Sequence, residues 1–478
     1  MNVIDTDYLI VGAGAAGMAF ADALIAAGNV DVVMVERRHC PGGHWNDAYP
    51  FVRIHHASAC YGVNSRMLGT DSIDQSGPNA GFYERASGIE ICAYFQRVLD
   101  DVLLTSGRFR FFGMCDYVGD WANEHVFASR LTGTSTAVRV RRKIIDTTYL
   151  EVSVPATHKP SFRFDPDVNF IPVGELVNLA ERPTGYTILG AGKTAMDACS
   201  WLLDNGEDPE RIRWIKPRDS WLLDRKALQP RELVTETVDG FSLGIEALAQ
   251  AHNLDELWPR LEACGQLVRL DPNITPEMYR GAILSAAERE GLKQIERVIR
   301  LGRVREIDAN RIVLAQGEIP TDLREVHVDC TAYGFRAAPV RPIFEPGRIT
   351  IQSLIGGHTT YNAALIGFIE STKRDDVEKN RLCPPVAQLA VPSDWIRMIV
   401  GVLNTSVLHS TEPDIKAWQE QSRLNLTLGI EAQISEPRMQ SAFSRWQENA
   451  EQALNNSEHL LSEAGGNEGR KKSGNLPK

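Results

Sequence analysis

Apolar residues twice form a short continuous run that leads into a glycine-rich turn and then into an alanine-rich segment. The first run spans Tyr8 to Val11 in DYLIVGAGAAG, and the second spans Tyr186 to Leu189 in YTILGAGKTA. A short unbroken apolar run is typical of a strand buried on both faces, and alanine favours a following helix. The pattern therefore predicts two strand–turn–helix units and an α/β fold built from two Rossmann-like domains.

Small residues in both turns are spaced as in dinucleotide-binding proteins. They are Gly12, Gly14 and Gly17 in the first turn, and Gly190, Gly192 and Ala195 in the second. The first glycine permits a tight bend, the second lets the backbone approach a pyrophosphate, and the third allows close packing of helix and strand. Ala16, Lys193 and Thr194 lie in the same turns and are also expected to bind cofactor. Two such turns predict two bound nucleotides and electron transfer between them.

The strand after each turn indicates which nucleotide is bound. VDVVMVE ends on Glu36, an acidic residue that accepts hydrogen bonds from a ribose hydroxyl and repels a 2′-phosphate, which fits FAD or NAD. Arg37 follows it and is expected at the same site. The second unit instead offers Lys216 and Arg218, cations suited to the 2′-phosphate of NADPH, with Lys193 inside the turn. NADH is the alternative, because such cations are also common at solvated strand ends.

At 478 residues, the chain exceeds one hydrophobic core. The expected parts are a discontinuous FAD-binding domain (1–165 and 328–384), an inserted NAD(P)H-binding domain (166–327), a helical C-terminal extension (385–464) and a disordered tail (465–478). VREIDANRIVLAQGEI predicts a hairpin around Ala309 and Asn310. Residues 347–372 are expected to form a strand, a glycine-rich turn and a helix.

Charge and cysteine spacing exclude several classes of protein. The net charge of −11 and the lack of a long basic run argue against a nucleic-acid partner. No apolar run has the length of a membrane span, and the N-terminus lacks the features of a secretory or transit signal. None of the eight cysteines has CxxC spacing, which argues against a redox disulfide or a metal site. We therefore expect a cytoplasmic protein without a metal, and a homodimer is possible in this interpretation.

These features together resemble the class B flavoprotein monooxygenases, which comprise the flavin-containing and the Baeyer–Villiger monooxygenases. The resemblance covers roughly residues 5–375. Beyond the two turns it rests on ERRHCPGGHW, on NDAYPFVRIHHAS and on VDCTAYGF, which is similar to the linker strand of the family. It implies bound FAD and NADPH, with Gly43, His44 and Trp45 beside the flavin. It also maps Arg218, in IKPRDSW, onto the arginine that binds the 2′-phosphate.

The chain also departs from that family. The F-x-G-x-x-x-H signature before the second turn is missing, and the ATG linker motif has become Thr-Ala-Tyr-Gly at 331–334. Two positions after Arg53, where the family carries asparagine or aspartate near the flavin, this chain has His55. Histidine can donate a hydrogen bond and, with an ordinary pKa of ~6.5, can also shuttle a proton. His55 and Arg53 are the candidate catalytic residues, with Arg53 expected to steady developing negative charge.

The resemblance implies an NADPH-dependent FAD oxidoreductase, specifically a monooxygenase that forms a C4a-(hydro)peroxyflavin and transfers oxygen from O2 to a small organic substrate. The alternative is an NADPH:acceptor oxidoreductase that inserts no oxygen, which the missing signature and His55 favour. A third interpretation is a non-catalytic binding module, against which the intact glycines, Glu36 and Arg218 argue. The sequence does not identify the substrate.

Overall fold

The first glycine turn joins the opening strand and helix of a parallel sheet. The computed structural model describes residues 2–473, with side chains up to residue 465. The sheet has the order β20-β21-β6-β1-β2-β3. Its strands are β1 (Asn2–Val11), β2 (Val32–Val35), β3 (Phe109–Phe112), β6 (Ser135–Asp146), β20 (Phe344–Glu345) and β21 (Arg348–Thr350). The expected buried strand, Tyr8 to Val11, lies within β1, flanked by β2 and β6. Helices pack on one of its faces, and Cys115 and Phe127 pack on the other.

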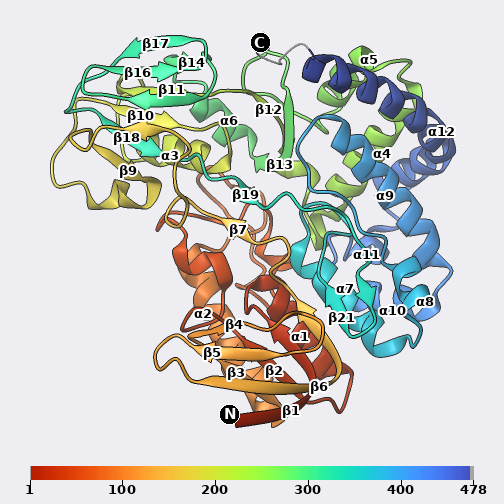
Figure 1. The fold of residues 1–478 in the computed structure, drawn as a ribbon. Coiled ribbons are helices and arrows are strands. Elements are labelled where there is room, and N and C mark those ends of the chain that lie inside the picture. The colour runs from red at the N-terminus through yellow and green to blue at the C-terminus, as the bar shows by residue number, and fades with distance from the viewer. Residues whose placement is uncertain (1, 474–478) are drawn as a thin grey trace.

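Helix α1 (Ala15–Ala27) follows this turn and packs against α7 (Thr359–Thr372). The strand, turn and helix expected over 347–372 are confirmed as β21, a glycine-containing turn and α7. The other elements of this lobe are α2 (Gly88–Val98), α8 (Asp376–Leu382), β4 (Cys115–Tyr117) and β5 (Val126–Ser129). This lobe forms the lower part of the molecule in Figure 1.

The second glycine turn belongs to a second parallel sheet, with the order β14-β11-β10-β18-β9. Its strands are β9 (Phe170–Pro172), β10 (Tyr186–Leu189), β11 (Ile212–Ile215), β14 (Val298–Ile299) and β18 (Val326–Asp329), and the turn leads into α3 (Lys193–Asp204). The expected hairpin is confirmed as β15 (Val304–Ile307) and β16 (Arg311–Leu314), which continue into β17 (Gly317–Pro320). The α/β fold with two Rossmann-like units is therefore confirmed.

The second unit is inserted into the first, because the chain leaves the first sheet after β6 and returns to it at β20. The unit is slightly larger than residues 166–327. It begins with β8 (Arg163–Phe164), which pairs with β15, and it includes β18, which pairs with β10 and β9. The two connections between the units lie side by side, because β7 (Val152–Ser153) pairs antiparallel with β19 (Gly334–Phe335) (Figure 1).

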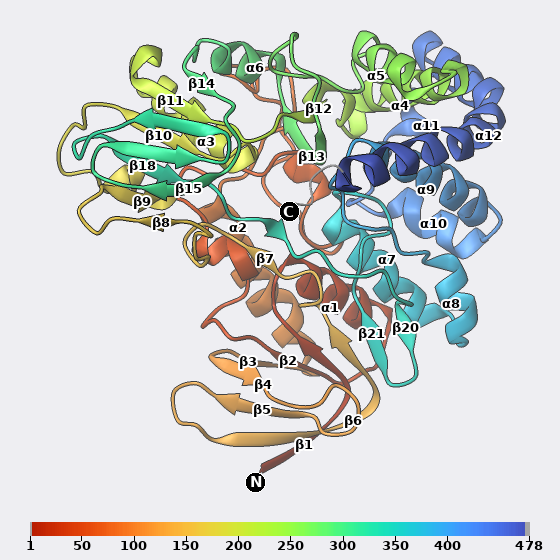
Figure 2. The same cartoon turned by 45° about the horizontal axis from the view of Figure 1, so that its top comes forward.

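A helical lobe is assembled from two distant parts of the chain (Figure 2). The insert contributes α4 (Val234–Gln250) and α5 (Leu254–Ala263), and the C-terminal part contributes α9 (Ser393–Ser410) and α12 (Pro437–Ser473). These helices share one apolar core, which includes Leu248, Trp395 and Leu460. The C-terminal helices are therefore half of a lobe and not a separate extension. Helix α12 continues to Ser473, within the range expected to be a disordered tail, and residues 474–478 lie outside the described residues.

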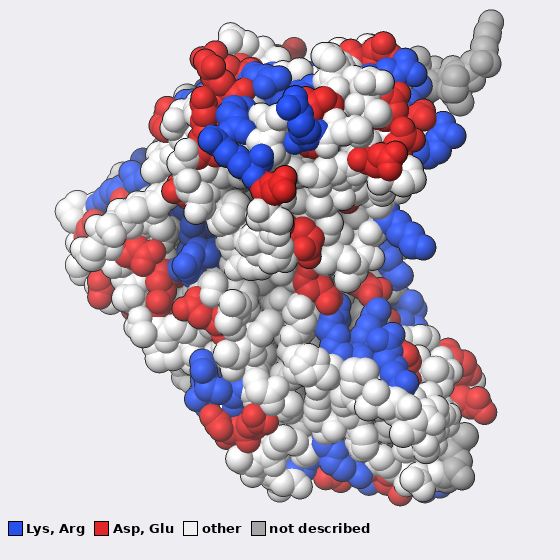
Figure 3. Space-filling model, turned by 90° about the vertical axis from the view of Figure 1, so that its left-hand side faces the viewer, with Lys and Arg blue, Asp and Glu red and all other residues white. Residues whose placement is uncertain are grey.

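Short elements complete the description: β12 (Ser220–Asp224), β13 (Met278–Leu284), α6 (Ala286–Leu292), α10 (Pro413–Gln421) and α11 (Ile430–Gln433). All eight cysteines lie in the described range, and each is a free thiol. On the face shown in Figure 3, acidic and basic side chains form small interspersed groups. Among the described residues, no helix combines the length and the apolar character that a membrane span requires.

We predict that Trp395→Ala lowers the free energy of unfolding of the helical lobe by about 3–5 kcal/mol, because it removes a large side chain that is 0% exposed. Thermal or urea unfolding followed by circular dichroism measures the loss. Val407→Ala is the control, because Val407 lies on the same helix but is 67% exposed and should change stability little. Equal stability of the two variants would contradict the assignment of Trp395 to a shared core.

Candidate functional site

A pocket of about 660 Å3 lies where the two sheets and the helical lobe meet. The first unit contributes His44, Trp45 and His55 to its wall, and the second unit contributes Gly190 to Thr194. The helical lobe contributes side chains of α4 and α9. The pocket thus adjoins the second glycine turn and the segment that follows the first unit's β2.

The backbone of the first glycine turn is accessible from outside. Gly12, Gly14 and Ala16 are partly exposed, whereas the residues between them are buried. Gly12 has φ +100°, and a Cβ atom on Gly17 would clash with the carbonyl oxygen of Gly12. The start of α1 has no side-chain cap at Gly14. The turn therefore presents free backbone and a helix N-terminus, which is the arrangement that binds phosphate.

Glu36, at the end of β2, lies against the same turn. One carboxylate oxygen accepts a hydrogen bond from the backbone N–H of Ala13 at 2.7 Å, and the other accepts one from the N–H of Arg38 at 2.9 Å. Arg37 is exposed and its guanidinium pairs with Glu151 at 2.6 Å. Gly43 packs so closely on the turn that its Cβ would come within 2.8 Å of the Cα of Gly14.

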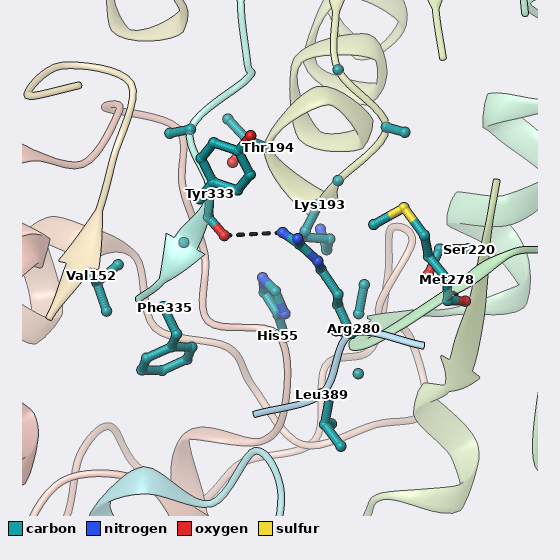
Figure 4. A pocket seen from close by; sticks show the side chains of 18 of the residues that line it. His55, Val152, Lys193, Thr194, Ser220, Met278, Arg280, Tyr333, Phe335 and Leu389 are labelled. Atoms are coloured by element: carbon teal, nitrogen blue, oxygen red, sulfur yellow. Dashed lines mark hydrogen bonds between the residues drawn. The ribbon is translucent and has the colours of Figure 1, made fainter. Parts of the chain in front are cut away.

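The second glycine turn opens directly onto the pocket. Gly190 has φ +132°, and a Cβ atom on Gly192 would meet nothing within 4 Å. Ala195 is fully buried at the start of α3, in the place of the third small residue. Lys193 forms an ion pair with Asp197 one helical turn later. Thr194 also lines the pocket (Figure 4).

The two cations expected to bind a 2′-phosphate lie in different surroundings. Lys216 is 2% exposed, pairs with Asp219 and lies 4.7 Å from the centre of the Trp214 ring. Burial lowers its pKa despite the neighbouring carboxylate. Arg218 is exposed, lines the pocket and has no protein partner among the described residues. Arg218 therefore has no competing protein partner in the described chain, whereas Lys216 is buried and already paired.

Arginines from two further segments lie near Arg218. Arg280 on β13 donates a hydrogen bond to the carbonyl oxygen of Tyr333 at 3.0 Å (Figure 4). Arg303 donates one to the Tyr333 hydroxyl at 2.9 Å. With Lys159 and Lys193, five cations line the pocket, and no aspartate or glutamate side chain does. The sequence motifs do not identify Arg280 or Arg303, since these residues come from separate segments without a shared local signal.

Four histidines line the part of the pocket nearest the first unit: His44, His55, His56 and His358. Burial lowers the pKa of His44 to about 4 and that of His358 to about 3. Burial, followed by the charge of Lys193, holds the pKa of His55 well below its usual value. These imidazoles are therefore neutral at pH 7 and can donate a hydrogen bond without carrying charge. Figure 4 shows His55 pointing into the pocket.

The rings around these histidines are also packed together. His56 stacks on His358 with 6.0 Å between ring centres, and His44 stacks on Trp45 at 5.0 Å. Trp45 donates its Nε1–H to the Tyr61 hydroxyl at 2.8 Å.

Arg53 is not part of the pocket. It is exposed and donates a hydrogen bond to the carbonyl oxygen of Arg85 at 2.8 Å, while its neighbours Val52 and Ile54 are buried. Arg53 forms an isolated bridge with Ser87, and its side chain is exposed to solvent. Arg53 is therefore outside the pocket wall, and the expectation that it stabilises charge beside a flavin is not carried into the proposal below.

A buried ion pair network holds the backbone of His55. Glu288 on α6 pairs with Arg225 at 2.6 Å and with Arg85 at 3.0 Å. Arg225 is fully buried, and its Nε–H donates to the carbonyl oxygen of His55 at 3.3 Å. Burial raises the pKa of Glu288, but the charges of Lys193, Arg225 and Arg85 outweigh burial and lower it to about 2.

Metal-ligating side chains form no cluster in the described part of the chain, and the thiol of Cys330 lies at the pocket. No group of three or more histidine, cysteine, aspartate or glutamate side chains there could hold a metal ion. Cys330 lines the pocket, but burial raises its pKa well above the usual value, so its thiol is protonated at neutral pH.

Fold and site together define a protein with two Rossmann-like dinucleotide-binding units around one pocket. The family model described as "NAD(P)-binding Rossmann-like domain" matches residues 10–60. The chain is 42% identical over 426 residues to the uncharacterized protein Rv2000 of Mycobacterium tuberculosis (strain ATCC 25618 / H37Rv), and equally so to Mb2023 of Mycobacterium bovis. The match covers 89% of this chain and 78% of each relative. The chain belongs to the same family as these mycobacterial proteins.

Several solved structures similar to the chain are monooxygenases. A flavin-containing monooxygenase from Stenotrophomonas maltophilia is 12% identical with a TM-score of 0.45, covering 80% of this chain and 99% of its own. A polycyclic ketone monooxygenase from Thermothelomyces thermophila is 14% identical with a TM-score of 0.49, covering 95% and 89%. A steroid monooxygenase bound to NADP is 12% identical with a TM-score of 0.47, covering 77% and 85%.

We predict that Glu288→Gln lowers the free energy of unfolding by about 3–5 kcal/mol at pH 7, because it leaves two buried guanidinium groups without a counter-charge. The variant and the parent protein should differ most in their free energy of unfolding above pH 4.5, the usual glutamate pKa. This difference should vanish as the pH falls toward 2, where Glu288 itself becomes protonated. Urea unfolding at several pH values measures it.

Glu290→Gln is the matched control, since Glu290 lies on the same helix but pairs with Lys293 at the surface. A similar small effect of both substitutions would show that the Glu288 network does not hold the lobes together.

Proposed function

We propose that the protein is an NADPH- and FAD-dependent oxidoreductase, specifically a monooxygenase that transfers oxygen from O2 to a small organic substrate. The observation that carries the proposal is the shared pocket, whose wall includes the second glycine turn together with His44 and Trp45, which follow Gly43 at the first turn. Two nucleotides held at the two turns would therefore extend their redox-active ends into one space. The match of residues 10–60 to an NAD(P)-binding Rossmann-like domain supports the nucleotide part of this proposal.

The first turn fits the pyrophosphate of FAD. Gly12, Gly14 and Ala16 expose backbone beside the uncapped N-terminus of α1. A carboxylate has about four acceptor positions, and two N–H groups occupy only part of that capacity on Glu36. Glu36 would accept from a ribose hydroxyl, and His358 at the start of α7 would lie beside the flavin ring.

The second turn fits NADPH. A Cβ atom on Gly192 would point into open space, α3 starts without a side-chain cap, and Arg218 has no protein partner in the described chain. Five cations without a carboxylate make this wall attractive to a ligand with several phosphates. In this proposal Arg218 binds the 2′-phosphate, and Lys193 and Thr194 border the pyrophosphate.

When bound, NADPH supplies a hydride, and FAD accepts it and passes the electrons to oxygen. The chain positions these groups and limits the access of water through the apolar side chains of the pocket. His55 donates a hydrogen bond from its neutral ring toward the reacting centre, because its lowered pKa keeps it uncharged at pH 7. A homodimer remains a prediction.

The second candidate is an NADPH:acceptor oxidoreductase that inserts no oxygen. It is favoured by the absence of the F-x-G-x-x-x-H signature and by histidine at position 55. Both candidates require the same two cofactors, so the fate of the oxygen atoms separates them.

We expect the purified protein to be yellow, to be reduced by NADPH without oxygen, and then to incorporate 18O from 18O2 into an organic product. A visible spectrum, anaerobic stopped-flow absorbance and mass spectrometry of the products measure these three steps. NADPH oxidation with an artificial acceptor, but with peroxide as the sole product of oxygen, selects the second candidate. A protein that cannot be loaded with FAD contradicts both.

Coenzyme choice gives a sharper expectation. Arg218→Ala should raise the KM for NADPH by roughly 10- to 100-fold, which corresponds to one or two charge-assisted hydrogen bonds at about 1.4 kcal/mol per tenfold. The KM for NADH and the FAD content should stay the same, because NADH has no phosphate at that position. Steady-state kinetics with both coenzymes measure the ratio.

Arg324→Ala is the control for this substitution, since Arg324 lies in the same unit, is exposed and does not line the pocket. An equal rise in the KM for both coenzymes in Arg218→Ala would mean that Arg218 supports the fold and does not recognise the phosphate. Lys216 is not expected to share the phosphate, because Asp219 already holds it.

A further inference from the structure

One part of the pocket wall, the arm, is formed by side chains of the helical lobe and of the segments beside it. The side chains that define this arm are Leu228, Phe241, Gln266, Leu389, Met398 and Val402. Leu389 and Met398 lie beside Gly356, because a Cβ atom on that glycine would come within 3.3 Å of each. Gly356 precedes His358 at the start of α7, so the arm begins next to the residues proposed to face the flavin.

The arm differs in charge from the rest of the pocket. All five cations of the pocket wall lie outside it, and the six side chains that define it are uncharged. Phe241, Leu389 and Met398 also belong to or pack against the apolar core of the helical lobe. An ion placed in the arm would lose its hydration without gaining a counter-charge, so the arm suits a neutral, mainly apolar molecule.

Gln266 is the polar exception in the arm. It is 3% exposed and lines the pocket, yet its side-chain amide has no hydrogen-bond partner among the described residues. The Gln266 amide is not among the buried polar atoms that lack a partner, so its nitrogen and oxygen are reached from the pocket. Its donor and acceptor groups are therefore available to a molecule that enters the pocket.

The local structure places Gln266 in this position. Helix α5 ends in a turn through Gly265, which has φ +76° and donates its N–H to the carbonyl oxygen of Glu262. The turn directs the next residue toward α4. A Cβ atom on Gly240 would lie 2.9 Å from Gln266 Nε2, and one on Gly244 would lie 2.9 Å from its Cγ.

These two glycines have no backbone reason to be glycine. Neither has a positive φ, and glycine inside a helix is less favourable than alanine. They are four residues apart and therefore share one face of α4. Their missing side chains make the space in which the Gln266 amide lies.

We infer that Gln266 is a specificity-determining residue for a neutral, mainly apolar substrate that carries one uncharged oxygen group. Its Nε2–H donates to a carbonyl or hydroxyl oxygen, and its Oε1 accepts from a hydroxyl, while the apolar body lies along Phe241, Leu389 and Met398. The inference deepens the proposed function and rests on it, because the arm opens beside the residues that would hold the flavin.

The test measures binding of 1-octanol, octane and octanoate to the purified protein by tryptophan fluorescence, since Trp395 lies against the same face of α4 as Gln266. The parent protein should bind 1-octanol more tightly than octane or octanoate. Gln266→Leu should lower the affinity for 1-octanol by about 3- to 10-fold, which is the effect of one neutral hydrogen bond. The affinity for octane should stay the same or rise. Gln266→Met serves if the leucine variant is thermally unstable.

Two further variants distinguish the loss of the Gln266 hydrogen bond from a change in the space around its side chain. Gly244→Ala should weaken 1-octanol and octane alike, because its Cβ would displace the Gln266 side chain and approach Trp395 Cζ2 at 3.2 Å. Gln250→Leu, the same substitution at an exposed position of α4, should change neither affinity. Equal affinity for 1-octanol in the parent protein and Gln266→Leu, or octanoate binding as tightly as 1-octanol, would overturn the inference.

FAD content and reduction by NADPH are measured on the same samples. Selective binding of 1-octanol by a protein that takes up no FAD would support Gln266 as a recognition residue and overturn the proposed function. Normal flavin reduction by a protein that does not distinguish 1-octanol from octane would overturn the role of Gln266 alone.

Discussion

The buried network of Arg85, Glu288 and Arg225 is the interaction on which the rest of the site depends. Arg85 belongs to the first unit, Arg225 follows β12, and Glu288 lies on α6 and also caps that helix through Ser285. Burying such charges costs several kcal/mol per ion unless hydrogen bonds and opposite charges compensate. That compensation exists only when all three segments are in place, so the network ties the lobes together around the pocket.

The same network sets the chemistry of His55. Arg225 holds its carbonyl oxygen, and the surplus of positive charge from Lys193, Arg85 and Arg225 adds to burial in disfavouring a charged imidazole. A histidine chosen for proton transfer at pH 7 would need a pKa near its ordinary value. This environment instead favours a neutral imidazole. Of the two roles that the sequence left open for His55, it favours the hydrogen-bond donor over the proton shuttle.

The sequence predicts those features that depend on local chemistry. The glycine turns, their strands, the hairpin at Ala309 and the insertion of one unit into the other follow from short patterns, because a tight turn constrains the residues within it. The helical lobe could not be predicted in the same way. An apolar helix face shows that α4 and α9 are buried, but it does not show that residues so far apart in the chain bury each other.

The same distinction between local pattern and tertiary contact applies to the residues of the site. Arg53 lies between two buried apolar residues in an extended segment, so the alternation in VRI was a local sign that it points outward. No local pattern indicated the burial of Lys216. Its ion pair with Asp219 forms in the segment that follows the end of β11 at Ile215. Arg280, Arg303 and Gln266 have no motif, because the tertiary fold alone brings their strands and turns to the pocket.

In a chain with a net charge of −11, a pocket wall with five cations and no carboxylate reflects a local separation of charge. Asp197 and Asp219, which pair with Lys193 and Lys216, do not line the pocket. The cationic wall lies beside the second turn and the uncharged arm lies in the helical lobe, with the neutral histidines between them. Such a gradient would place a phosphate-bearing coenzyme and an uncharged molecule at opposite ends of the same cavity, with their reacting parts at the histidines.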